Sequence, residues 1–135
     1  MVHRSNLTVR FAETDLLGHV NNSSYFIYLE QARVDFFNEL VSDPNRWQFI
    51  LASVKCDFHR QAYFNQTLTV ETTVANIGNK SFRLSQPICD SDTGDKIAYG
   101  ESAIVYFNFD TQKSEPIPDD LREKLSGYLS KKTAT

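Results

Sequence analysis

The fold is decided by one stretch near the middle of the N-terminal half, Tyr25-Phe26-Ile27-Tyr28-Leu29-Glu30-Gln31-Ala32-Arg33-Val34-Asp35-Phe36-Phe37-Asn38-Glu39-Leu40. At about 100° per residue, its apolar side chains share one stripe; the stripe consists of Tyr25, Leu29, Ala32, Phe36 and Leu40. The pattern predicts one long helix, capped by Asn22, Ser23 or Ser24 and stopped by Asp43-Pro44-Asn45. Ile27 and Val34 lie on the opposite side, which indicates a second contact surface.

Apolar and polar residues alternate on both sides of this helix, and the alternation predicts five strands, over 7–11, 50–59, 68–74, 81–88 and 97–109. Gly78-Asn79 predicts a two-residue hairpin turn. A short C-terminal helix is expected over Asp119–Tyr128. A strand, a long helix and four further antiparallel strands predict an α+β fold in which the helix lies across a curved antiparallel sheet of about five strands.

Composition narrows the class of protein. The 135 residues favour a single domain over 1–135, and 41% hydrophobic residues are enough for a core. A net charge of −3 argues against a nucleic-acid partner. No apolar run approaches the roughly 20 residues of a membrane span, and the N-terminus lacks the apolar core of a secretory signal. A membrane partner is therefore not expected. A metal site is not expected either, because the three histidines are scattered and no metal-ligand spacing is present.

The two cysteines, Cys56 and Cys89, fit small buried thiols, although a disulfide between them stays open at this stage. Free thiols are typical of a reducing compartment, and we therefore expect a cytoplasmic protein.

The densest group of polar residues lies between the first strand and the helix, in Glu13-Thr14-Asp15-Leu16-Leu17-Gly18-His19-Val20-Asn21-Asn22. A helix start carries unsatisfied N–H groups and a positive dipole end, which can hold a developing negative charge. A nearby carboxylate can act as a base or a nucleophile, so the stretch suits attack on a carbonyl. The alternative is purely structural, since Asp and Asn are common turn and cap residues.

The stretch from Val9 to Asn22, followed by Tyr25, Tyr28, Glu30, Ala32 and Arg33, resembles the signature of the hot-dog acyl-CoA thioesterases, and within them the 4-hydroxybenzoyl-CoA thioesterase-like group. The resemblance covers nearly the whole chain. It implies a hot-dog fold and hydrolysis of acyl-CoA to a free acid and CoA, without a metal or a bound cofactor.

The resemblance also implies roles for single residues. Asp15 takes the place of the catalytic aspartate, as nucleophile or as base for a water. The backbone N–H near Asn22 polarises the thioester carbonyl, and His19, Val20 and Tyr25 line the acyl end. Glu13, two residues before Asp15, is expected to point elsewhere and to tolerate replacement by Gln.

Two further features accompany the resemblance. Some relatives place their catalytic carboxylate on the helix, where Glu30 stands here; the preferred interpretation is an i,i+3 ion pair with Arg33. After Phe58, relatives usually carry Pro and Ala and then a Gly in the following turn, whereas this chain reads Arg60-Gln61-Ala62-Tyr63-Phe64-Asn65-Gln66.

Candidate CoA-binding residues are Arg60, Lys80, Ser81 and Arg83, of which the three cations suit the nucleotide phosphates. Two rival functions stay open: a hot-dog dehydratase, although no Pro accompanies His19, and a non-catalytic acyl-CoA-binding protein. An unpaired edge strand, and the interprotomer site implied by the resemblance, predict a homo-oligomer, a dimer or a homotetramer. The preferred acyl group is left undetermined.

Overall fold

The computed structural model describes residues 1–15, 18–43 and 47–130. Along the chain its elements are β1 (His3–Thr8), the 3-10 helix η1 (Phe11–Glu13), α1 (Asn22–Leu40), β2 (Phe49–Phe58), β3 (Thr67–Ile77), β4 (Ser81–Asp90), β5 (Lys96–Asn108), β6 (Lys113–Ser114) and α2 (Asp119–Ser126). No helix in these described ranges is long and apolar enough to cross a membrane.

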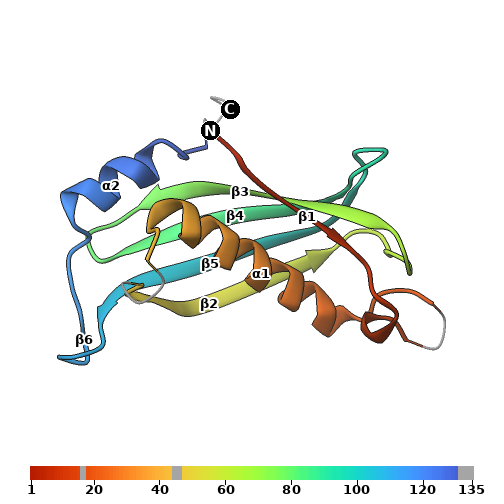
Figure 1. The fold of residues 1–135 in the computed structure, drawn as a ribbon, viewed down its shortest axis with the longest axis horizontal. Coiled ribbons are helices and arrows are strands. Elements are labelled where there is room, and N and C mark those ends of the chain that lie inside the picture. The colour runs from red at the N-terminus through yellow and green to blue at the C-terminus, as the bar shows by residue number, and fades with distance from the viewer. Residues whose placement is uncertain (16–17, 44–46, 131–135) are drawn as a thin grey trace.

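The sheet has the order β1-β3-β4-β5-β2, and β6 pairs with the end of β5. All these strand pairings are antiparallel. Helix α1 lies diagonally across one face of the sheet, and α2 packs at the end where α1 finishes (Figure 1). The predicted α+β architecture, with one long helix against an antiparallel sheet and a short C-terminal helix, is confirmed.

Helix α1 buries the predicted stripe. Leu29, Ala32 and Phe36 are fully buried, and Tyr25 and Leu40 are nearly so. The stripe joins two hydrophobic clusters, one around the start of α1 and one between its end and α2. Helix and sheet approach closely at Gly100, where a Cβ would lie 2.6 Å from a methyl carbon of Leu29.

The structure corrects several boundaries. The first strand spans His3–Thr8 rather than 7–11, and Phe11 belongs to a 3-10 turn with 74% of its surface exposed. The β3–β4 connection has three residues, 78–80, so the two-residue turn at Gly78-Asn79 is wrong. The C-terminal helix ends at Ser126. Pro44 and Asn45, part of the predicted stop signal, lie outside the described residues.

Strand β2 is an edge strand whose inner face is largely uncovered. Leu51 pairs with the core residue Ile104 but is 42% exposed, and Val54 and Phe58 are 36% and 43% exposed. On the side of α1 where Ile27 indicated a second contact surface, Ile27 is 52% exposed within this chain. The sheet is therefore wider than the single helix that covers it.

Candidate active site

The loop between η1 and α1 folds into a small hairpin. Thr14 pairs with Val20, the Asp15 N–H donates to the His19 carbonyl at 3.0 Å, and the Gly18 N–H donates to the Asp15 carbonyl at 2.9 Å. Gly18 has a φ of +83°, a left-handed conformation that glycine adopts without strain. A second pairing, between His19 and Tyr63, fixes the loop against the β2–β3 connection. The backbone around Asp15 is thus held on both sides.

Asp15 and His19 face each other across this hairpin. The Asp15 Oδ2 and His19 Nδ1 atoms are 3.4 Å apart, and their side chains are 42% and 19% exposed. Asp15 borders a cavity that Phe11, Thr14 and Gly18 also line. His19 borders a second cavity, at the start of α1. His19 thus lines one cavity, and its partner Asp15 lines the other.

The start of α1 leaves two backbone donors open. The Asn21 side chain caps the helix by accepting the Ser24 N–H at 3.0 Å, and the Asn21 N–H donates to the Glu13 carbonyl at 3.0 Å. The cap is Asn21 and not one of the residues 22–24. No acceptor for the N–H groups of Asn22 and Ser23 is found within the described part of the chain. With the helix dipole behind them, these N–H groups form an anion-stabilising end.

The predicted substrate-binding residues meet in one cavity of about 220 Å³. His19, Val20, Asn22 and Tyr25 line it. The other lining residues come from the end of β2 and the segment after it, and they are Phe58, His59, Arg60 and Gln61. The sequence analysis missed Phe58, His59 and Gln61, because their place in the cavity wall depends on where β2 ends beside α1. Asp15 is absent from the lining of this cavity, but its partner His19 lines it.

Tyr25 is buried and lines this cavity. Its hydroxyl accepts the Ala62 N–H at 3.1 Å, and its ring contacts those of Tyr28 and Phe58. Burial raises the pKa of the Tyr25 hydroxyl, so it stays protonated near neutral pH. The turn that follows contains Asn65 at φ +71°, a left-handed conformation that Asn tolerates.

Glu13, which was expected to point away from Asp15 and to tolerate Gln, has a structural role. Its carboxylate is buried and accepts hydrogen bonds from the Arg10 N–H at 2.8 Å, the Arg10 guanidinium at 2.7–2.8 Å and the Tyr28 hydroxyl at 2.8 Å. Burial alone would raise the pKa of Glu13, but these hydrogen bonds outweigh it and the pKa is lowered. Glu13 does point away from Asp15, toward Tyr28, and thereby fastens the loop to α1.

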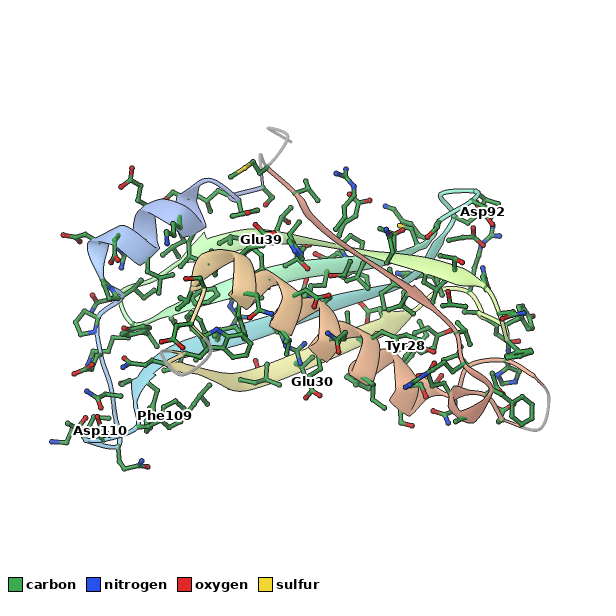
Figure 2. All side chains as sticks on the ribbon, in the orientation of Figure 1. Tyr28, Glu30, Glu39, Asp92, Phe109 and Asp110 are labelled. Carbon is green, nitrogen blue, oxygen red and sulfur yellow. The ribbon has the colours of Figure 1, made fainter. Side chains whose placement is uncertain are left out.

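Glu30 and Arg33 do not form the expected ion pair. Glu30 lies on the exposed face of α1 (Figure 2), whereas Arg33 turns inward and is 5% exposed. Arg33 donates a long hydrogen bond of 3.5 Å to the Gln86 side chain, and among the described residues no carboxylate lies within 4 Å of its guanidinium. Burial lowers the pKa of Arg33.

The four candidate CoA-binding residues are not brought together within one chain. Arg60 lines the cavity and pairs with Asp95 at 3.4 Å. Lys80 and Ser81 lie at the β3–β4 connection, next to α2 and at the opposite end of the sheet from the start of α1 (Figure 1). Arg83 follows on β4 with an exposed side chain.

Cys56 and Cys89 are free and half-buried rather than fully buried. Across residues 1–15, 18–43 and 47–130, no group of three or more His, Cys, Asp or Glu side chains could hold a metal ion.

Comparison with known proteins places this geometry in a family. Residues 9–125 match the sequence model of the thioesterase-like superfamily. The chain is 30% identical over 128 residues to the long-chain acyl-CoA thioesterase FadM of Escherichia coli (strain K12), covering 90% of this chain and 96% of that protein.

Solved structures agree. A predicted thioesterase from Bacillus stearothermophilus superposes with a TM-score of 0.89 at 34% identity, covering 96% of this chain and 98% of that one. A thioesterase from Thermus thermophilus, complexed with coenzyme A and Zn, gives a TM-score of 0.82 at 27% identity, covering 90% and 95%. The family match extends over most of the described chain, from the end of β1 into α2. This chain therefore belongs to the thioesterase-like superfamily and has the hot-dog fold of its acyl-CoA thioesterases.

Proposed function

We propose that this protein hydrolyses acyl-CoA thioesters to a free acid and CoA, with Asp15 as base or nucleophile. One observation carries the proposal: Asn22, whose N–H group is open, lines a cavity whose wall also holds His19, the partner of Asp15. An electrophile with a polarisable oxygen fits between such donors and such a carboxylate. Membership of a family that hydrolyses acyl-CoA thioesters supports the thioester as that electrophile.

The chemistry follows from these groups. As base, Asp15 takes a proton from water while the water oxygen attacks the carbonyl carbon, and the carbonyl oxygen becomes an oxyanion beside the Asn22 N–H. Collapse of this intermediate breaks the C–S bond, and the proton that Asp15 took from water passes to the thiolate of CoA. As nucleophile, Asp15 instead forms an acyl anhydride, expels the thiolate and is freed by water. His19 lies within 3.4 Å of the carboxylate and orders it in both routes.

We also propose a homo-oligomer in which β2 pairs with its copy, giving a dimer as the smallest unit of the predicted dimer or tetramer. The uncovered apolar side chains of β2, Leu51, Val54 and Phe58, support this arrangement. Antiparallel pairing of two β2 strands would bring the Arg60 end of one chain toward the opposite end of the other, which carries Lys80. The candidate CoA residues could then meet across the interface.

Light scattering tests the assembly. We expect at least twice the monomer mass of 15.5 kDa at micromolar concentration, and a smaller particle for Val54→Asp. A wild-type mass near that of one chain would refute the oligomer. The free thiols also suit the proposed cytoplasmic location.

Thiol release from benzoyl-, short-chain and long-chain acyl-CoA tests the reaction and identifies the acyl preference. Asp15→Asn keeps the size of the side chain and removes its charge, so turnover should fall about 10²–10⁴-fold. Asp110→Asn makes the same chemical change at the tip beyond β5, far from the site (Figure 2), and should leave turnover intact. A fall in Glu30→Gln with an active Asp15→Asn would move the chemistry to the helix. Binding of acyl-CoA without thiol release would instead favour the non-catalytic rival.

A further inference from the structure

The hydroxyl of Tyr25 is a buried polar group at the wall of the candidate active-site cavity. Tyr25 is 2% exposed and lines this cavity together with Val20 and Asn22. A tyrosine hydroxyl carries one donor hydrogen and can accept up to two hydrogen bonds. Here it accepts the Ala62 N–H at 3.1 Å, and no protein acceptor for its own hydrogen is found among the residues that the structure describes. Its donor capacity is therefore left for whatever fills the cavity.

Tyr28, one helical turn further on, provides the contrast. It is equally buried, and its hydroxyl is committed to the Glu13 carboxylate at 2.8 Å. A buried donor without an acceptor is unfavourable, and proteins rarely leave one unless a ligand or a water completes it. Among the described residues, the Tyr28 hydroxyl hydrogen thus has an acceptor and the Tyr25 hydroxyl hydrogen does not, so only Tyr25 can donate to a carbonyl oxygen.

The Tyr25 hydroxyl and the open helix start belong to one rigid frame. The Ala62 N–H holds the hydroxyl, and the Ala62 carbonyl accepts the Val20 N–H at 2.7 Å, two residues before Asn22. The tyrosine ring is fixed by Phe58 at a centroid distance of 5.4 Å and by Tyr28 at 6.0 Å. Donors held in place before the reaction stabilise a developing charge without reorganisation.

We propose that the Tyr25 hydroxyl donates a hydrogen bond to the thioester carbonyl oxygen, as a second donor beside the Asn22 N–H. This inference rests on the proposed hydrolysis. It makes Tyr25 a catalytic residue rather than only part of the cavity wall. As the carbonyl carbon is attacked, its oxygen gains negative charge and both hydrogen bonds strengthen. The hydroxyl keeps its proton throughout, so it acts as a neutral donor and not as an acid.

Two non-hydrolysable CoA derivatives test the contact. The ketone analogue has a methylene between sulfur and the carbonyl carbon, and the thioether analogue has the same chain without the carbonyl oxygen. Tyr25→Phe should weaken the ketone about fivefold, the worth of one hydrogen bond, and leave the thioether unchanged. It should lower kcat about 10²-fold with little change in KM. Tyr28→Phe, the matched loss of a buried hydroxyl, should keep the ketone-to-thioether ratio of the wild type.

The carbonyl stretch of a 13C-labelled ketone gives a direct signature. A hydrogen bond from Tyr25 lowers its frequency, and Tyr25→Phe should raise it again. If Tyr25→Phe does not fold, 3-fluorotyrosine at position 25 supplies a more acidic hydroxyl, which should lower the frequency further and tighten the ketone. An unchanged frequency and ketone-to-thioether ratio would refute the proposal and leave Tyr25 as the acceptor for Ala62. Should the wild type bind neither analogue, the proposed function fails and this inference fails with it.

Discussion

Replacement of Glu13 by Gln tests how the loop between η1 and α1 is held. The carboxylate accepts bonds on both oxygens: Arg10 N and the Tyr28 hydroxyl on Oε1, and the Arg10 guanidinium on Oε2. The Gln side chain has one acceptor oxygen, so its NH2 group must stand where one of the two carboxylate oxygens of Glu13 accepted hydrogen bonds. The guanidinium is exposed and can turn to water, so the oxygen should stay with Tyr28. Loss of the charge on the remaining bonds should cost about 2 kcal/mol.

This cost predicts a lower Tm of Glu13→Gln, by about 5–9 °C for a domain of this size. Circular dichroism melts at neutral pH measure it. Tyr28→Phe removes one donor and should cost about 1 kcal/mol alone, but less in the Glu13→Gln background, because the two residues share one bond. A Tm for Glu13→Gln within about 2 °C of the wild type would refute the reasoning, since surface substitutions have effects of that size.

Acidity provides an independent check. The folded-state pKa of Glu13 lies below its ordinary value, so its contribution to stability is complete above about pH 4.3 and is lost as the pH falls through the lower folded-state value. The Tm difference between wild type and Glu13→Gln should therefore shrink on acidification below that point. A difference that stays constant down to pH 3 would show that the carboxylate charge contributes nothing.

Three further predictions concern the packing around the site. Asn21→Ala removes the cap on the Ser24 N–H and should cost about 1 kcal/mol in urea unfolding. Gly100→Ala places a Cβ 2.6 Å from Leu29 and should cost about 1–3 kcal/mol, partly recovered by shortening Leu29 to Val, as melting curves of single and double variants would show. Burial raises the pKa of the Cys56 thiol, so mass spectrometry should show slower alkylation by iodoacetamide near neutral pH than for a free cysteine.

The helix and the sheet could be predicted because the spacing of apolar residues along the sequence indicates each of them directly. The apolar residues from Tyr25 to Leu40 repeat with the period of a helix and form one buried face, so no other secondary structure fits them. The first strand was shifted because Phe11 continues the alternation in the sequence. The hydrogen bonds between Arg10 and Glu13 turn the chain there into a 3-10 helix. They depend on the burial of the Glu13 carboxylate, which the alternation of apolar and polar residues does not predict.

Single residues of the candidate site could be predicted from the sequence, but their arrangement around the cavity could not. The motif located His19, Asn22 and Tyr25, which the structure brings to one cavity. The cap could not be assigned among adjacent Asn and Ser residues, because each has the required oxygen and only the loop path selects Asn21. Arg33 was expected to pair with Glu30, but it turns inward and donates to Gln86 on β4, a contact that the spacing of charges along the helix does not reveal.

The strand order also has a consequence for how the protein folds. β3, β4 and β5 follow one another in sequence and pair as neighbours, whereas β1 joins β3, and β2 joins β5, across long intervening segments. Closing long loops costs entropy before contacts repay it, so we expect the C-terminal meander to form first and the N-terminal half to add to both its edges. The loop carrying Asp15 would then be ordered late. The protein's single tryptophan, Trp47, lies between α1 and β2 and packs on Phe37, so its fluorescence should report this late docking of the N-terminal half.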